Sequence, residues 1–217
     1  MFFANACVVC DADAGPVCEA CTSRLDRVDG PERRWSVPAG AHPAFEQCRA
    51  AFVLDDTSRT IVPALKYRNQ HRLSAWFADQ AAALVPQAAD VLTWIPATPE
   101  RRRVRGYDQG KELARQLSTL TGVPARPLLC RNRGDTRQTG QSRADRQRGP
   151  RLYSYRRRPA VAEFVVLVDD VITTGSSLRS AVDVLVAVGV RRVITIAMAA
   201  TASPQRPTSP PSPQMGV

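Results

Sequence analysis

The 217-residue sequence predicts an α/β fold, in which a mainly parallel sheet is flanked by helices, with a small cysteine-rich module before it and a disordered tail after it. From residue 90 onward, continuous apolar runs alternate with segments of helical period, a pattern typical of parallel sheets covered on both faces. Four of the six cysteines lie within the first 30 residues, and five prolines follow residue 200, where almost nothing can be buried. We therefore expect a module at 1–30, an α/β domain at 44–200 and a disordered tail at 201–217.

The strands of the domain are indicated by short runs of apolar residues. An apolar run at Ala50–Leu54 precedes a helical pattern that extends from Leu73 to Leu84. Beyond it, buried strands are expected at 91–95, 164–168 and 193–198.

Two helices between these strands have clear end signals. Asp108 can cap the first, and Gly122 can end it. Its expected apolar face consists of three leucines, Leu113, Leu117 and Leu120. The second helix is expected at 177–188, with Gly189 in the position of a C-cap glycine.

The net charge of +10 comes almost wholly from arginine, because Lys66 and Lys111 are the only lysines. Attraction to polyanions such as nucleic acid or phosphorylated metabolites is one interpretation, and a compositional bias without function is the other. Local clusters at 101–105 and 131–158 are more informative than the sum. No apolar run approaches the roughly 20 residues of a membrane span, and the N-terminus lacks the basic region of a signal peptide. We expect a soluble, cytoplasmic protein that does not bind membranes.

The N-terminal cysteines form two CxxC pairs, Cys7-x-x-Cys10 and Cys18-x-x-Cys21. Four thiolates at this spacing suit a tetrahedral, structural zinc ion. Iron–sulfur ligation, a pair of disulfides and unligated thiols are the alternatives, and reducing surroundings disfavour the disulfides. The other two cysteines and both histidines are isolated, and no chemistry is assigned to them: Cys48, Cys130, His42 and His71.

The most specific pattern is VVLVDDVITTGSS, from Val165 to Ser177. It indicates a strand, two carboxylates and a small polar loop that opens onto a helix. Backbone N–H groups, hydroxyls and a helix N-terminus together suit a phosphate monoester, and Gly175 lets the backbone approach it closely. Asp169 and Asp170 can then accept hydrogen bonds from the hydroxyls of a sugar whose phosphate lies in the loop. An Asp-Asp turn followed by an ordinary helix cap is the alternative.

A basic turn at Thr98–Arg105 follows the strand expected at 91–95. Ligands of open parallel sheets lie at the carboxyl ends of strands, so this turn and the acidic loop can face one crevice. The arginine fork donates two parallel hydrogen bonds and suits pyrophosphate, for which Arg103 and Arg105 are the candidates. Arg101 or the loop at 131–158 could serve in their place. A solvated basic helix face is the alternative.

The run from Val165 to Ser177 is similar to the 5-phosphoribosyl 1-pyrophosphate (PRPP) signature of type I phosphoribosyltransferases. The order of segments resembles that of the ComF/GntX family over about residues 7–200. The matching segments are the cysteine module, Leu65-Lys66-Tyr67-Arg68, the series from Arg101 to Gln109, a loop with Thr136, Thr139–Gln141 and Arg143–Arg148, and the PRPP signature.

The resemblance implies a type I phosphoribosyltransferase-like fold and a role for each matched residue. Asp169 and Asp170 would hold the ribose 2- and 3-hydroxyls as the catalytic pair, with Mg²⁺ bridging the pyrophosphate. Five residues would cradle the 5-phosphate: Thr173, Thr174, Gly175, Ser176 and Ser177. Two residues depart from the family pattern, since Asp108 replaces the usual asparagine and Asn69 stands near a frequent glycine. We expect the loop at 131–158 to be mobile, either as a lid or as an unstructured insertion.

Two functions of different classes follow. As an enzyme, the protein would transfer a phosphoribosyl group from PRPP to an unidentified, nucleobase-like acceptor and release pyrophosphate, mainly through orientation and electrostatic stabilisation. As a non-catalytic accessory protein, it would bind PRPP or nucleic acid, with single-stranded DNA as the partner. For the second function, the resemblance brings in DNA uptake during natural competence.

Overall fold

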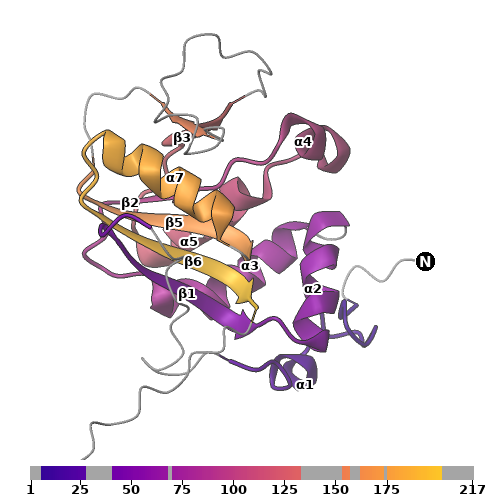
Figure 1. Ribbon diagram of the computed structural model, residues 1–217. Coiled ribbons are helices and arrows are strands. Elements are labelled where there is room, and N and C mark those ends of the chain that lie inside the picture. The colour runs from indigo at the N-terminus through magenta and orange to yellow at the C-terminus, as the bar shows by residue number, and fades with distance from the viewer. Residues whose placement is uncertain are drawn as a thin grey trace, which may run out of the picture.

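The computed structural model describes residues 6–27, 41–67, 70–132, 153–156, 162–173 and 175–201 (Figure 1). Its elements are α1 (Glu19–Thr22), β1 (Phe45–Val53), α2 (Asp56–Tyr67), α3 (Gln70–Ala81), the 3₁₀ helix η2 (Ala82–Leu84), β2 (Val91–Trp94), α4 (Pro99–Arg105), α5 (Gln109–Thr121), β3 (Leu129–Arg131), β4 (Tyr153–Tyr155), β5 (Phe164–Ile172), α7 (Ser176–Ala187) and β6 (Arg192–Ala200). Several features expected from the sequence lie outside the described residues: Arg68, Asn69, most of the loop at 131–158 with its motif residues, Thr174, and the tail from residue 202.

Four strands form one sheet in the order β1-β6-β5-β2, and each neighbouring pair is parallel. Parallel neighbours require crossover connections, and the segments between these strands supply helices on both faces. The predicted α/β fold with a mainly parallel sheet is thus confirmed. The antiparallel pair of β3 and β4 stands apart from the sheet and contacts α7.

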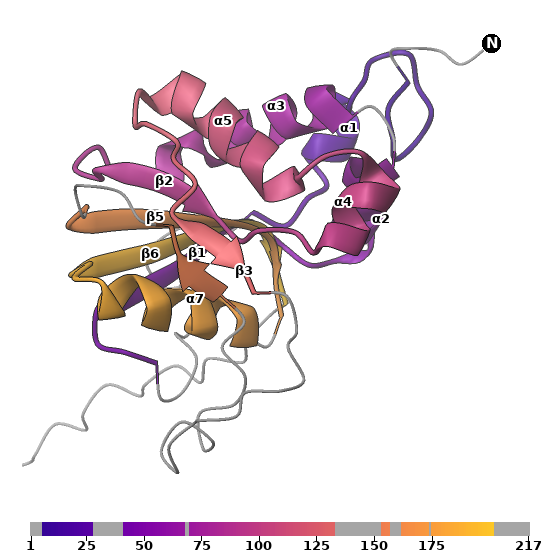
Figure 2. The ribbon, with the colours of Figure 1, turned by 90° about the horizontal axis from the view of Figure 1, so that it is seen from above.

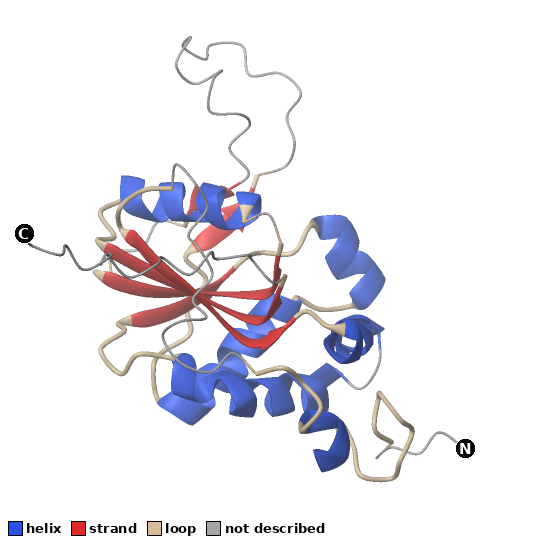
Figure 3. Ribbon diagram, turned by 60° about the horizontal axis from the view of Figure 1, so that its bottom comes forward, coloured by secondary structure: helices blue, strands red, loops and turns tan. Residues whose placement is uncertain are grey.

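Helices cover both faces of the sheet (Figures 2 and 3). One face packs against α7, whose buried residues are Leu178, Ala181, Val182 and Leu185. The other face packs against α3 and α5, and the fully buried residues there include Leu73, Phe77, Leu113 and Leu117. Leu120, expected on the same buried face, is 53% exposed, because it lies in the last turn of α5 beyond the packed positions. That part of the prediction was wrong.

Strand β5 is longer than the expected 164–168 and includes the acidic pair. Asp169 pairs with Ala197, and Ile172 pairs with Ala200 of the central neighbour β6. The ladder continues past the carboxylates because β6 itself remains apolar up to Ala200. The two carboxylates therefore belong to a strand end and not to a loop.

The basic segment at 99–105 is a helix, where the sequence analysis expected a turn. Thr98 accepts a hydrogen bond from the N–H of Arg101, Pro99 occupies the first turn, and Gly106 ends the helix in the left-handed conformation. These are ordinary helix start and stop signals. Helix α2 was not predicted either, since Pro63 lies inside it.

The cysteine-rich region packs onto the sheet and α2. Its residues Val17, Cys21 and Leu25 are buried in the same apolar cluster as the residues of α3 and α5. Immediately after this region, Arg27 forms an antiparallel bridge with Phe52, on the outer edge of β1. A second bridge, between Leu92 and Ala125, covers the outer edge of β2.

None of the helices in the described part of the chain combines the length and the apolar character that crossing a membrane would require.

Candidate functional site

The acidic pair lies near the end of β5, at the carboxyl edge of the sheet. Asp169 and Asp170 are both half-buried, and as neighbours in a strand they point to opposite faces. Oδ1 of Asp169 accepts a hydrogen bond from the N–H of Asp170, and Oδ1 of Asp170 accepts one from the N–H of Val171, both at 2.9 Å. These bonds fix each carboxyl group against the backbone of the strand end.

Burial raises the pKa of Asp169 well above its usual range, and the negative charge of Asp170 adds to the rise. The N–H of Asp170 and the positive charge of Arg101 lower this pKa without cancelling the effect of burial. A carboxyl group whose charged form is disfavoured is stabilised by a ligand that donates hydrogen bonds or brings positive charge. The strand end is therefore suited to a hydroxyl-bearing or cationic ligand.

The polar turn after β5 leads directly into α7. Thr173 and Ser176 are exposed, Ser177 is half-buried and Gly175 is buried. Gly175 is the N-cap of α7 with φ of 68°, a conformation that favours glycine. It has no side chain with which to cap the helix, whereas Thr98 and Asp108 cap α4 and α5 with side-chain oxygens. The N-terminus of α7 thus offers backbone N–H groups to an anion.

Helix α4 begins beside this edge, because β2 and β5 are neighbours and the N–H of Ile95 donates to the carbonyl of Val168 at 3.1 Å. The two proposed pyrophosphate residues differ in their surroundings. Arg103 is exposed, while Arg105 is half-buried and donates to Oε1 of Gln109 at 3.2 Å. Arg101, the alternative to these two residues, is the α4 arginine whose charge acts on Asp169. The charge of Arg101 is therefore felt at Asp169, whereas Arg105 is hydrogen-bonded to the start of α5.

The turn between α4 and α5 is held by side chains that the sequence analysis did not assign to the site. Oδ1 of Asp108 accepts from the N–H of Lys111, and Oδ2 accepts from the N–H of Ala97, each at 3.3 Å. Both oxygens thus accept backbone N–H groups, a role that one carboxylate fills and the amide of asparagine cannot. The hydroxyl of Tyr107 donates to the carbonyl of Leu65 in α2. No local pattern signals that contact, because its two residues belong to different helical segments.

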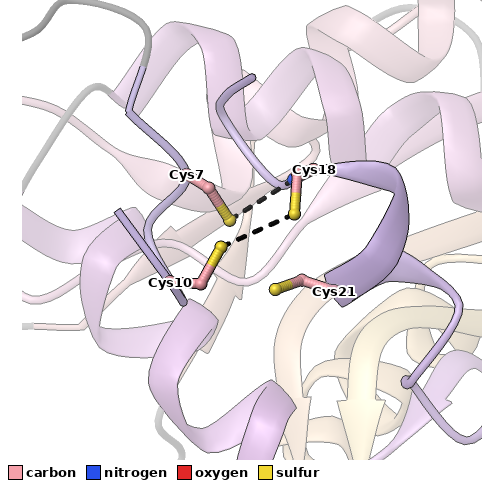
Figure 4. Close-up of side chains that lie close together, drawn as sticks. All are labelled: Cys7, Cys10, Cys18 and Cys21. Atoms are coloured by element: carbon pink, nitrogen blue, oxygen red, sulfur yellow. Dashed lines mark hydrogen bonds between the residues drawn. The ribbon is translucent and has the colours of Figure 1, made fainter. Parts of the chain in front are cut away.

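The four N-terminal cysteines converge, as the two CxxC pairs predicted (Figure 4). Their sulfur atoms all lie within 4.8 Å of one another, and Cys7, Cys18 and Cys21 are buried while Cys10 is exposed. Tetrahedral zinc with bonds of about 2.3 Å requires sulfur atoms about 3.8 Å apart. The separation of 3.6 Å between the sulfurs of Cys10 and Cys18 is close to this value. The donor set therefore fits a four-coordinate zinc ion.

The thiols of this cluster differ in acidity. Burial raises the pKa of Cys7, but hydrogen bonds from backbone N–H groups outweigh it and lower the pKa to about 6. Burial and the neighbouring thiols raise the pKa of Cys21 to about 12. Crowded thiolates repel one another, and a divalent cation relieves that repulsion. Outside the cluster, burial raises the pKa of Cys48 to about 12, so this thiol remains protonated at neutral pH.

The phosphoribosyl transferase domain family matches residues 106–211 of the chain, which include the acidic pair and the start of α7. Three solved structures are similar in shape. The allosteric regulatory enzyme of purine biosynthesis is 24% identical with a TM-score of 0.46, over 63% of this chain. Glutamine PRPP amidotransferase from B. subtilis is 25% identical with a TM-score of 0.45, over 62% of this chain. The match spans only 30% of either enzyme.

The third structure, adenine phosphoribosyltransferase from Leishmania tarentolae, is 14% identical with a TM-score of 0.37, over 59% of this chain and 70% of that protein. Among curated proteins, competence protein ComFC of Bacillus subtilis (strain 168) is 22% identical over 186 residues, which cover 76% of this chain and 75% of ComFC. This similarity and the domain match agree with the order of motifs along the sequence. The chain therefore contains a phosphoribosyl transferase domain and is similar to the competence protein ComFC over most of its length.

Proposed function

We propose that the protein binds PRPP at the carboxyl end of β5 and transfers its phosphoribosyl group to a nucleobase-like acceptor. One observation carries the proposal. Within the matched domain, two half-buried carboxylates are followed directly by a polar turn and by the N-terminus of α7, which Gly175 leaves without a side-chain cap. Carboxylates and an open helix N-terminus at this spacing suit the two ends of a ribose 5-phosphate.

In this proposal each side of the site has its own task. Asp169 and Asp170 accept hydrogen bonds from the ribose 2- and 3-hydroxyls, and the turn from Thr173 to Ser177 holds the 5-phosphate. The arginines of α4, including Arg103 and Arg105, serve the pyrophosphate side. Carboxylate oxygens are the donors that Mg²⁺ prefers, so Asp169 and Asp170 fit a site for it. When bound, Mg²⁺ supplies positive charge to the pyrophosphate.

The proposed transfer replaces one bond at C1 of the ribose with another. The bond from C1 to the pyrophosphate oxygen breaks, pyrophosphate leaves with the electron pair, and a nitrogen of the acceptor forms the new bond and loses its proton. Positive charge develops at C1 as the leaving group departs. The negative charges of Asp169 and Asp170 stabilise this positive charge. Orientation and electrostatic stabilisation therefore provide most of the rate enhancement.

The test is pyrophosphate release by the purified protein with PRPP, Mg²⁺ and each of a panel of purine and pyrimidine bases. Release that depends on one base supports the transfer. If the protein binds PRPP but releases pyrophosphate with none of the bases, the proposed transfer is contradicted and the protein only binds PRPP. A protein that binds no Mg·PRPP in calorimetry would contradict the proposal as a whole.

We further propose that the cluster of Cys7, Cys10, Cys18 and Cys21 holds one structural zinc ion. All four positions around the metal would be filled by the protein, so the ion would have no open position for chemistry. Elemental analysis of protein purified without chelator should find one zinc per chain. Iron in its place, or no metal, would refute the assignment.

A second candidate function is a role in DNA uptake, which the similarity to the competence protein ComFC favours. The exposed arginines of α4, Arg101, Arg102 and Arg103, offer positive charge to a phosphate backbone. If they contact phosphates, affinity for single-stranded DNA should fall steeply as salt rises, with a slope set by the number of contacts. No binding at low salt, or an affinity that does not depend on salt, would contradict this function.

A further inference from the structure

A tyrosine side chain joins two segments that lie 42 residues apart in the sequence. The hydroxyl of Tyr107 donates a hydrogen bond to the backbone carbonyl of Leu65. Leu65 belongs to the last turn of α2, where carbonyl groups lack a helical N–H ahead of them. Tyr107 lies between α4 and α5, so the bond fixes this turn to the end of α2.

Helix α4 depends on this turn for its direction. None of its residues is buried, and its side-chain hydrogen bond from Arg105 to Gln109 ties it only to the start of α5. Its C-terminus ends at Gly106, and Tyr107 follows at once. Helix α5 on the far side of the turn is firmly placed, because a Cβ at Gly110 would lie 3.1 Å from the carbonyl oxygen of Ile95. The bond from Tyr107 thus acts at the joint between a fixed helix and a loosely held one.

The other partner of the bond belongs to the core around the cysteines. Leu65 is fully buried in the same apolar cluster as Cys18 and Cys21. At the other end of α2, the carboxylate of Asp55 accepts from the N–H of Asp26, which belongs to the cysteine module, at 3.4 Å. Figure 1 shows α2 between the cysteine-rich region and α4. Packing around the cysteines is therefore connected through α2 to the turn at Tyr107.

Tyr107 also lies within electrostatic reach of the acidic strand end. Burial raises the pKa of Tyr107 to about 12; the charge of Arg105 opposes the rise, and the negative charges of Glu112 and Asp170 add to it. The phenol remains a hydrogen-bond donor at neutral pH, and its surroundings include a member of the acidic pair. The joint is thus coupled electrostatically to the acidic strand end.

We propose that Tyr107 is a positioning residue, whose bond to Leu65 sets the direction of α4 at the pyrophosphate side of the site and makes that side depend on the cysteine module. This inference rests on the proposed binding of PRPP and assigns Tyr107 no contact with the ligand. The 5-phosphate side is built on β5 and α7, which the bond does not hold. Loss of the bond therefore affects the two halves of PRPP unequally.

The first test uses Tyr107→Phe, which removes the hydroxyl and keeps the ring. In calorimetric titrations the affinity for Mg·PRPP should fall about fivefold, as the loss of one neutral hydrogen bond implies, while the affinity for ribose 5-phosphate stays unchanged. The matched control is Tyr155→Phe, which removes a buried hydroxyl without a hydrogen-bond partner among the described residues and should change neither affinity. Equal losses for both ligands in Tyr107→Phe would overturn the proposal, because a general loss of structure has that effect.

The link to the cysteine module is tested with Cys10→Ser, a change at the exposed member of the cluster, alone and combined with Tyr107→Phe. Each single change should weaken Mg·PRPP binding. The double variant should bind Mg·PRPP as tightly as the single variant with the lower affinity, because both changes interrupt the same connection. Additive losses would refute the link.

Hydrogen exchange of the ligand-free protein gives a measurement that does not depend on PRPP or on the folding of the cysteine variant. In Tyr107→Phe, the amides of residues 99–111 and of the last turn of α2 should exchange faster, and those of residues 165–172 should not change. If the wild-type protein binds no PRPP, the proposed function falls, and this pattern still decides whether Tyr107 ties the two segments. Unchanged exchange in both segments would refute the tie even where PRPP binds.

Discussion

The cysteine cluster and the acidic strand end both gather similar groups from nearby positions, but the protein encloses them to different degrees. In the cluster, four sulfur atoms lie within 4.8 Å of one another, and three of the four cysteines are buried. At the strand end, Asp169 and Asp170 are half-buried, and Thr173 beside them is exposed. A closed set of four ligands suits a structural metal, whereas an open edge leaves room for a ligand that exchanges with solvent.

The two regions also differ in the sign of their expected effect on stability. Metal binding to the cluster stabilises the folded chain, since the unfolded chain offers no preformed site. Asp169 destabilises the folded chain at neutral pH, because burial and the charge of Asp170 disfavour its charged form. Residues that hold the fold and residues that hold a ligand can therefore be distinguished by what their removal does to stability.

The largest effect is expected from Cys21→Ala, compared with Cys48→Ala as a control. Both thiols are buried, but only Cys21 belongs to the cluster. Structural zinc in small domains contributes on the order of 10 kcal/mol, so Cys21→Ala should abolish zinc binding and the cooperative unfolding transition. Cys48→Ala should cost about 1 kcal/mol. Thermal unfolding followed by circular dichroism, with zinc measured in parallel, compares them; similar stability of the two variants would contradict a structural role for the metal.

The next effect concerns the ligand and not the fold. Replacing both Asp169 and Asp170 with asparagine should lower the affinity for Mg·PRPP by more than about 100-fold, since two charge-assisted hydrogen bonds of about 1.5–3 kcal/mol each are lost. Unfolding of the variant should remain cooperative, because the bonds to the following N–H groups need only a side-chain oxygen. Unchanged PRPP affinity in calorimetry would remove the carboxylates from the site.

A smaller effect should separate the two halves of the open edge. Replacing Arg103 and Arg105 with alanine should weaken PRPP about tenfold or more and ribose 5-phosphate much less, because these arginines match only the pyrophosphate. Arg105 is hydrogen-bonded to Gln109, whereas the charge of Arg101 acts on Asp169. The affinities of Arg101→Ala for the same two ligands should therefore be compared with those of the double variant. Equal loss of both ligands in the double variant would mean that Arg103 and Arg105 support the structure of the site and not pyrophosphate binding.

Much of the fold could be predicted because its signals are local. Asp108 and Gly122 bound α5 as expected, and β2, α7 and β6 appear within a few residues of their predicted ranges. Strand β1 was indicated only by an apolar run, because its first half contains Glu46, Gln47 and Arg49 and its partner β6 comes from the other end of the domain. Parallel pairing over such a distance leaves no local pattern.

The site shows the same division between local and distant information. The convergence of the four cysteines could be predicted from their spacing. The proximity of the acidic pair and α4 could be predicted because both follow the carboxyl ends of neighbouring strands. The helical form of α4 could have been predicted from Thr98, Pro99 and Gly106, whose signals were present in the sequence. The contact from Tyr107 to Leu65 could not, since it depends on how two helices meet in space.

The smallest expected effect tests the sign of the acidic pair's contribution to stability. The folded-state pKa of Asp169 is raised, so its ionisation destabilises the fold above the unfolded pKa of about 3.9, increasingly until the pH passes the folded value. Asp169→Asn should therefore raise the melting temperature at pH 7 by a few degrees, and the gain should vanish as the pH falls toward 4. Melting curves across this range measure the effect, and a loss of stability at pH 7 would show that the carboxylate supports the fold.

The bridge between Arg27 and Phe52 has a consequence for how the chain behaves at high concentration. It covers the carboxyl end of the outer edge of β1, where the N–H of Val53 also donates to the carbonyl of Asp26. An uncovered strand edge is a template on which a second chain can pair and aggregate. The short segment after the cysteines therefore protects this part of the edge from pairing with a second chain.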